Sequence, residues 1–383
     1  MPRLIVLTVF VVAIFLSSTS FARSISEDNQ VLNLTMTEIG QTLVDAYPFI
    51  LAKRELTAKE VEDVGEILKR LKRLFLRAGP YIKQKSRAYQ VSYQYVLKHL
   101  EQTQSAYDKK DVRFVRQRLT TLGTVCISCH TQDTELRTLF PGASRQQFPD
   151  DYSYAEFNFT TRNYEEAERY FDQYLATGQA ETELAVIRPL QRLVTIYTQI
   201  FNQPGLGAKK LSKYIALKSH SPQTKKYLAE MVVGMKTLEG EGVSKIEKIN
   251  FAQIEDYVQK YIGDNDILPN IIYSTPEEEV ARVWLRGVLY HYLNGKPKKN
   301  EIPKILYWLS VVDRAVGYNY YFSLSDYYLK ECIQTYPNHP YAWHCYAEYE
   351  NYMNGIHLDS ETEFLPIDVH RELQQLKALL KKR

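Results

Sequence analysis

The chain has 383 residues and a formal net charge of +3, with 48 basic and 45 acidic side chains. This near balance argues against a nucleic-acid-binding protein, which presents a strongly basic face. The length predicts two or three domains. Apolar residues recur at three- and four-residue steps over long stretches, and no stretch shows the sustained alternation of a β-strand, so we expect a nearly all-α fold.

Residues 1–22 have the pattern of a secretory signal peptide. Arg3 precedes an apolar run over residues 4–16, and Ser20 and Ala22 form a cleavage site of small residues. Removing this segment deletes one arginine and changes the net charge from +3 to +2. We therefore expect an exported, periplasmic protein. The alternative is an uncleaved membrane anchor, which the length of the run disfavours because a membrane-spanning helix needs about 20 apolar residues.

Four helices are predicted within residues 30–145, over residues 34–47, 58–78, 87–107 and 112–136. Pro48 and the pair Gly79 and Pro80 predict the ends of the first two helices. Thr57 and Glu60 have the spacing of a capping box at the start of the second helix. Because short connections join long helices, we expect antiparallel neighbours in a four-helix bundle.

The most informative motif lies on the fourth helix, where residues 126–130 read Cys-Ile-Ser-Cys-His. This is the attachment sequence of a c-type haem. Cys126 and Cys129 share a helix face and would form thioethers with the two vinyl groups of one porphyrin, while His130 would bind the iron as proximal ligand. The alternatives are a redox disulfide, which is typical of a strand-helix unit, and half of a zinc site, which needs a second ligand pair. Export and covalent haem attachment support each other, since attachment occurs outside the cytoplasm.

Haem attachment on the last helix of such a bundle resembles the class II c-type cytochromes, the cytochrome c-prime and c-556 group. The resemblance implies one covalent haem c and a distal residue on the first helix. Met36 is the candidate distal ligand, and Gly40 one turn later would leave room beside a porphyrin. The alternative for Met36 is core packing, which would leave the iron five-coordinate. His99 on the third helix is a competing ligand candidate, but it lies one residue off the apolar stripe and is interpreted as a surface or boundary histidine.

Residues 150–383 are predicted to form a second all-α domain, which follows a linker over residues 141–150. The spacing of Tyr164, Ala167, Phe171 and Leu175 resembles the second helix of a tetratricopeptide repeat. A partial second match surrounds residues 336–347, and a helix over 368–381 is expected to cap the array. Stacked helical hairpins of this kind bury a continuous core and commonly dock a partner. We expect them to bind a redox partner protein or a membrane-associated assembly.

No nucleophile–histidine–acid arrangement, phosphate-binding loop or His/Glu metal cluster is recognisable, so an electron carrier is expected rather than an enzyme. Aromatic residues near the C-terminal third are expected to be packed rather than to form a binding surface: Tyr318, Tyr320, Tyr321, Tyr327 and Tyr328. Cys332 and Cys345 lie at equal distances from a predicted turn, either as a disulfide or as two buried thiols.

The predicted function is electron transfer by a haem protein with a partner-docking domain. The first alternative is a five-coordinate haem that binds a small gas such as NO or CO. The second alternative is an interaction scaffold without haem, in which Cys126 and Cys129 form a disulfide. Absorbance spectra of the purified protein distinguish the three.

Overall fold

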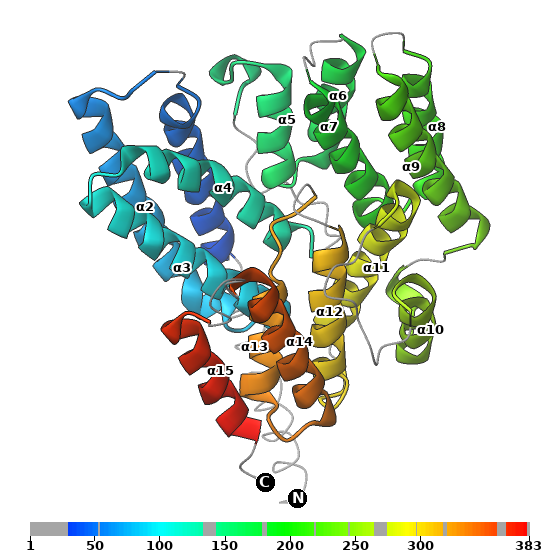
Figure 1. The fold of residues 1–383 in the computed structure, drawn as a ribbon. Helices are drawn as coiled ribbons and strands as arrows, with labels where there is room; N and C mark the ends of the chain where they lie inside the picture. The colour runs from blue at the N-terminus through cyan, green and yellow to red at the C-terminus, as the bar shows by residue number, and fades with distance from the viewer. Residues whose placement is uncertain are drawn as a thin grey trace, which may run out of the picture.

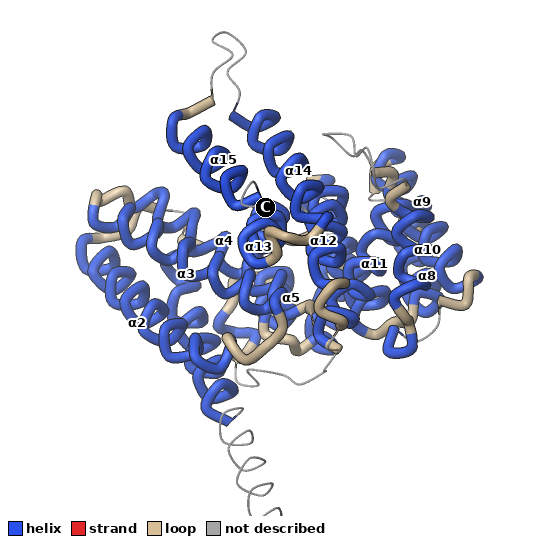
Figure 2. The backbone as a smooth tube through the Cα atoms, turned by 90° about the horizontal axis from the view of Figure 1, so that it is seen from below, coloured by secondary structure: helices blue, strands red, loops and turns tan. Residues whose placement is uncertain are grey.

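The computed structural model describes residues 30–380, except residues 53, 133–142, 178–181, 218–219, 244–245, 264–273, 296, 317–319 and 358–364. The predicted signal peptide therefore lies outside the described residues. The described part is helical throughout and contains no strand, which confirms the all-α prediction (Figures 1 and 2).

The first helix covers residues 30–50. The helices that follow are α2 (Ala58–Ile82), α3 (Arg87–Asp108), α4 (Val112–His130), η1 (Arg145–Gln147), α5 (Asp151–Thr160), α6 (Tyr164–Ala176), α7 (Glu183–Thr195), η2 (Ile196–Ile200), α8 (Pro204–Ile215), α9 (Pro222–Gly240), η3 (Ile246–Lys248), α10 (Phe251–Tyr261), α11 (Pro276–Asn294), α12 (Ile302–Val316), α13 (Ser325–Thr335), α14 (Pro340–His357) and α15 (Ile367–Leu380).

The first helix, α2, α3 and α4 lie together at the N-terminal side of the molecule (Figure 1). The predicted capping box starts α2: the Glu60 backbone N–H donates to the Thr57 hydroxyl, and the Thr57 N–H donates to the Glu60 carboxylate. Arg77 ties α2 to the first helix by donating to the Thr35 hydroxyl over 3.0 Å and by pairing with Glu38 over 2.6 Å.

Two predicted helix ends were wrong, because each proline lies near the end of its helix. The first helix runs on past Pro48 to residue 50, and the Leu51 N–H still donates to the Tyr47 carbonyl over 2.9 Å. Helix α2 continues through Pro80 to Ile82. A proline in the last turn removes a single N–H donor, and in α2 the carbonyl that loses this partner belongs to the exposed residue Leu76.

The remaining helices follow one another in an arc, and consecutive helices pack together, as α5 does with α6, α8 with α9, and α13 with α14 (Figure 1). The face predicted for the first of these pairs is buried, with Tyr164, Ala167, Phe171 and Leu175 all at most 2% exposed. Near the C-terminus α15 packs on α13 and α14. It covers Ile367–Leu380, close to the predicted 368–381.

One continuous apolar core includes residues from the first helix through to α15. The core continues on both sides of the predicted linker. There the described residues 143–150 contain a short 3₁₀ turn and lead directly into α5. Helix α3 packs against α11 and α13, and α4 packs against α5. The region that carries the Cys-x-x-Cys-His motif is therefore in direct contact with the C-terminal helices.

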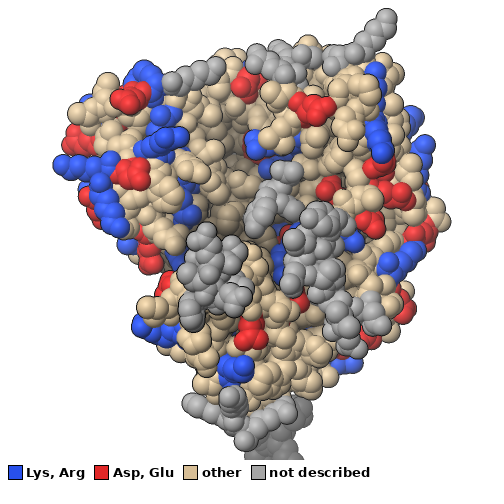
Figure 3. All heavy atoms as spheres, viewed as in Figure 1, with Lys and Arg blue, Asp and Glu red and all other residues tan. Residues whose placement is uncertain are grey.

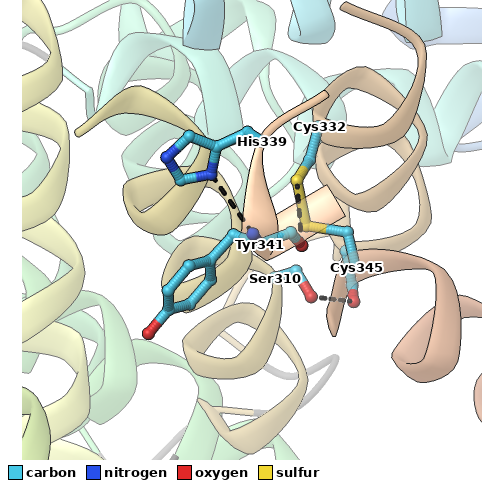
Figure 4. Close-up of a disulfide and its surroundings, with 6 residues drawn as sticks. Ser310, Cys332, His339, Tyr341 and Cys345 are labelled. Carbon is cyan, nitrogen blue, oxygen red and sulfur yellow. Dashed lines mark hydrogen bonds between the residues drawn. A yellow bond between two sulfur atoms is a disulfide. The ribbon is translucent and has the colours of Figure 1, made fainter. Parts of the chain in front are cut away.

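The aromatic residues of the C-terminal third are packed, as expected. Tyr320, Tyr321 and Tyr328 are at most 2% exposed, and Tyr327 is partly buried against the core. Tyr318 lies outside the described residues. Cys332 and Cys345 form a disulfide between α13 and α14, with their Cα atoms 6.4 Å apart (Figure 4). The structure thus decides between the two alternatives that the sequence left open.

Candidate cofactor site

The two cysteines of the motif lie in the last turn of α4 and are not bonded to each other. Cys126 is 7% exposed, and Cys129 is partly buried. Burial raises the pKa of each thiol to about 12, so both are protonated near neutral pH. Their spacing of three residues places them on one face of the helix, as the sequence predicted.

Helix α4 ends at the motif. The predicted end at residue 136 was too late for this helix, because α4 stops at His130 and residues 131–132 form a turn. Its N-terminus is capped by Asp111, whose carboxylate accepts from the Phe114 N–H over 3.0 Å. Because the motif occupies a helix end, the imidazole of His130 can reach beyond the helix towards α5.

The imidazole of His130 is oriented by a backbone group. Its Nδ1 hydrogen-bonds to the carbonyl of Thr160, the last residue of α5. Since a carbonyl only accepts, the proton must lie on Nδ1, and the Nε2 lone pair is left for a metal. Burial lowers the pKa of His130 to about 4, so the ring is neutral near pH 7.

The first helix also contributes to the cavity at the motif. Met36 and Gly40 line the same cavity as Cys126, Cys129 and His130. The cavity has a volume of about 50 Å³, and its other walls come from α2, α3 and α5. The structure therefore brings together every residue that the sequence assigned to the cofactor: two thiols and an imidazole from α4 and a methionine thioether from the first helix line one cavity.

The residues at this cavity fit a covalently bound haem. Thiols can form thioethers with vinyl groups, a neutral imidazole with a fixed tautomer can bind iron, and the remaining walls are mainly apolar. Among the described residues, no group of three or more His, Cys, Asp or Glu side chains converges to hold a metal ion. A haem needs no such group, because the porphyrin supplies four of the iron ligands.

The interpretation of His99 as a surface or boundary residue was wrong. Its side chain is 1% exposed, and Nε2 hydrogen-bonds to the Arg118 carbonyl over 2.7 Å. Burial lowers its pKa to about 4. His99 lies one position away from the apolar stripe of α3 and is still buried, because α4 packs against that side of α3. His99 does not line the cavity of the cysteine pair.

Sequence reasoning missed a buried polar network directly behind the motif. Arg286 on α11 is fully buried, pairs with Asp313 on α12 over 2.7 Å, and donates to the hydroxyl of Thr131 over 3.1 Å. Gln199, in the π-helical turn that ends α7, donates to the carbonyl of Thr131 over 2.6 Å. A π turn is a frequent device at functional sites, and here it turns Gln199 towards the end of α4.

The same junction contains further hydrogen bonds across the chain. Ser128 donates to the Phe322 carbonyl over 2.8 Å, and Asn294 donates to the Gln132 carbonyl over 2.8 Å. The residues around the motif thus hold α4 against α11 and the start of α13. A charged residue inside an apolar helical run, such as Arg286 between Leu285 and Gly287, is the sequence signal that could have identified this network.

Searches against protein-family models, curated proteins and solved structures returned no match to this chain. Across the part of the chain that the structure describes, no helix is both long enough and apolar enough to cross a membrane.

Proposed function

We propose that this protein is an exported c-type cytochrome that carries one covalent haem and transfers single electrons. The observation that supports this most strongly is the convergence at one apolar cavity of Cys126, Cys129 and His130 from α4 with Met36 from the first helix. The finer architecture belongs to the same proposal: the first helix, α2, α3 and α4 as a cytochrome bundle, and the later helices as a repeat-like domain that docks a partner.

When bound, the haem would supply an iron that changes between the ferrous and ferric states. The residues of the chain would hold it and adjust its potential. Cys126 and Cys129 would fix the porphyrin, and His130 would bind the iron through Nε2 while Nδ1 stays hydrogen-bonded to Thr160. Met36 would complete the iron coordination, and a methionine–histidine pair raises the haem potential.

The buried network behind the motif would limit movement when the charge on the iron changes. Thr131 follows His130 directly and accepts hydrogen bonds from Arg286 and Gln199. A site whose neighbours are fixed in this way needs little rearrangement during electron transfer. The export of the protein is proposed from its N-terminal sequence alone.

The rival function is gas binding at a five-coordinate iron. The two functions differ in the role of Met36, which lines the same cavity as His130. We expect purified, haem-loaded protein to give a low-spin ferrous spectrum that CO does not change. A high-spin ferrous spectrum that changes on addition of CO would contradict electron transfer through a six-coordinate haem and favour the gas-binding function. Absence of any haem absorption would leave only the interaction scaffold.

A further inference from the structure

A second and larger cavity adjoins the cavity of the cysteine pair. It has a volume of about 370 Å³ and lies between the first helix, α4, α5 and α7. The two cavities share Leu43 and Thr160 as lining residues. Thr160 is the residue whose carbonyl accepts the hydrogen bond of His130. Figure 3 shows a hollow on this face beside α4 and α5, with basic side chains at its edge.

The cavity at the cysteines is too small for a haem by itself, and the adjoining cleft would supply further space. Ligands of this size fill pockets of about 300–1,000 Å³, whereas the cavity at the cysteines has about 50 Å³. The vinyl groups that react with cysteines lie along one edge of the porphyrin, and two propionate groups lie on the opposite edge. If Cys126 and Cys129 hold the vinyl edge, the adjoining cleft has the space for the propionate edge.

The cleft contains two arginine side chains that could bind a propionate. Arg188 and Arg192 lie four residues apart on α7 and both line the cleft. The guanidinium of Arg192 already has partners within the protein. Its Nε donates to Glu156 over 2.8 Å, its Nη2 donates to Glu156 over 3.2 Å, and its Nη1 donates to the Tyr320 carbonyl. Arg188 is exposed, and no carboxylate among the described residues pairs with it.

Hydroxyl groups lie on two other walls of the cleft. Tyr152 on α5 lines it, as do Thr120 and Thr121 on α4, whose hydroxyls donate to the backbone carbonyls of Arg116 and Gln117. Burial is the main cause that raises the pKa of Tyr152, so its hydroxyl stays protonated. Arg188 is therefore the group of the cleft best suited to a carboxylate, because a guanidinium forms strong, charge-assisted hydrogen bonds with one.

We propose that Arg188 binds a haem propionate in this cleft, so that α5 and α7 of the C-terminal region complete the cofactor site. This inference rests on the proposed haem function. It makes the haem a bridge between the two predicted domains, because its vinyl edge is held by α4 and its propionate edge by α7. Arg192 and Glu156 act as the fixed wall behind this contact.

The test uses full-length, haem-loaded protein and the variant Arg188→Gln. The covalent haem and its spectrum should be retained, because Arg188 touches neither the iron nor the thioethers. Removing a positive charge beside the haem should shift the reduction equilibrium towards the ferric form by about threefold to tenfold, and a tenfold shift corresponds to about 59 mV for a one-electron couple. The pH range over which the midpoint potential changes should also move upward, because a propionate without its cation has a higher pKa.

Two further variants make the result specific. Arg188→Lys should keep most of the wild-type potential, since it keeps the charge. Arg371→Gln removes an exposed arginine from α15, away from the cleft, and should leave the potential and its pH dependence unchanged. If Arg188→Gln carries haem and matches the wild type in both potential and pH dependence, the propionate contact is wrong while the cytochrome function stands. If the wild type carries no covalent haem, the function itself fails and this inference fails with it.

Discussion

At the scale of single residues, burial controls the chemistry near the motif. His99 and His130 are both kept neutral by desolvation, with pKa values lowered to about 4. His130 is the one that lines the cofactor cavity, whereas His99 is enclosed between α3 and α4. The sequence identified His130 from its position in a motif. It misplaced His99, because a stripe of apolar residues on one helix does not reveal how wide the covered face is.

The neutral state of His99 predicts a loss of stability in mild acid. Its pKa is about 4 in the folded state and 6.5 in the unfolded chain. The unfolded state therefore takes up a proton first as the pH falls, and the free energy of unfolding decreases between pH 6.5 and pH 4, by up to about 3 kcal/mol. We expect His99→Gln to lose less stability than the wild type between pH 7 and pH 4.5 in urea unfolding of haem-loaded protein. Equal losses in both proteins would contradict this account.

Met36 is the residue whose role the proposed function depends on most. It lies on the first helix and lines the same cavity as His130. Replacement by leucine keeps the volume but removes the sulfur. If Met36 binds the iron, Met36→Leu should convert ferrous haem from low to high spin and allow CO to bind, and the reduction potential should fall. An unchanged spectrum would show that Met36 only packs.

At the scale of elements, the position of α4 explains how a short motif becomes a site. Apolar periodicity predicted the helices of the N-terminal region and their order, and Thr57 with Glu60 marked a true helix start. Periodicity extended α4 too far, because the chain after His130 turns to hydrogen-bond with α11 and η2. Such contacts between residues more than 60 positions apart leave no trace in a local pattern.

The buried ion pair behind α4 predicts a large effect from a small substitution. Asp313 is fully buried as a side chain and accepts from Arg286 and from the Leu324 N–H over 2.9 Å. Asp313→Asn leaves the Arg286 charge without a counter-ion, which costs about 3–5 kcal/mol when the pair is buried. Asp63→Asn is the matched control, since Asp63 pairs with Lys59 at the surface of α2 and should change stability far less. Equal effects of the two variants in urea unfolding would contradict this role.

At the scale of the whole molecule, one apolar core connects regions that composition divides into two. The predicted boundary near residues 141–150 rested on proline and glycine, which mark turns but do not report packing across them. The buried face of α6 was predicted correctly, at Tyr164 and Phe171. The contact of these helices with α3 and α4 depends on tertiary packing and could not be predicted from sequence.

The disulfide between α13 and α14 gives a prediction for the C-terminal helices. Cys332 and Cys345 are separated by 13 positions, and a bridge that closes a loop of this size stabilises a protein by about 3 kcal/mol. The double variant Cys332→Ala/Cys345→Ala should lower the free energy of unfolding by about this amount, and reducing agent should affect the wild type but not the variant. Two titratable free thiols in denatured, unreduced wild-type protein whose haem thioethers are intact would show that the bridge does not form.

The central claim is that Cys126 and Cys129 hold a haem covalently, and the intact mass of the exported protein tests it most directly. We expect protein secreted by a host with haem-attachment machinery to have the mass of the chain without its signal peptide plus one haem, to keep its red colour in acid-acetone, and to give a c-type pyridine haemochrome spectrum. Cys126→Ala/Cys129→Ala should lose all three properties. An unmodified chain mass for the wild type in such a host, with no haem absorption, would contradict the account.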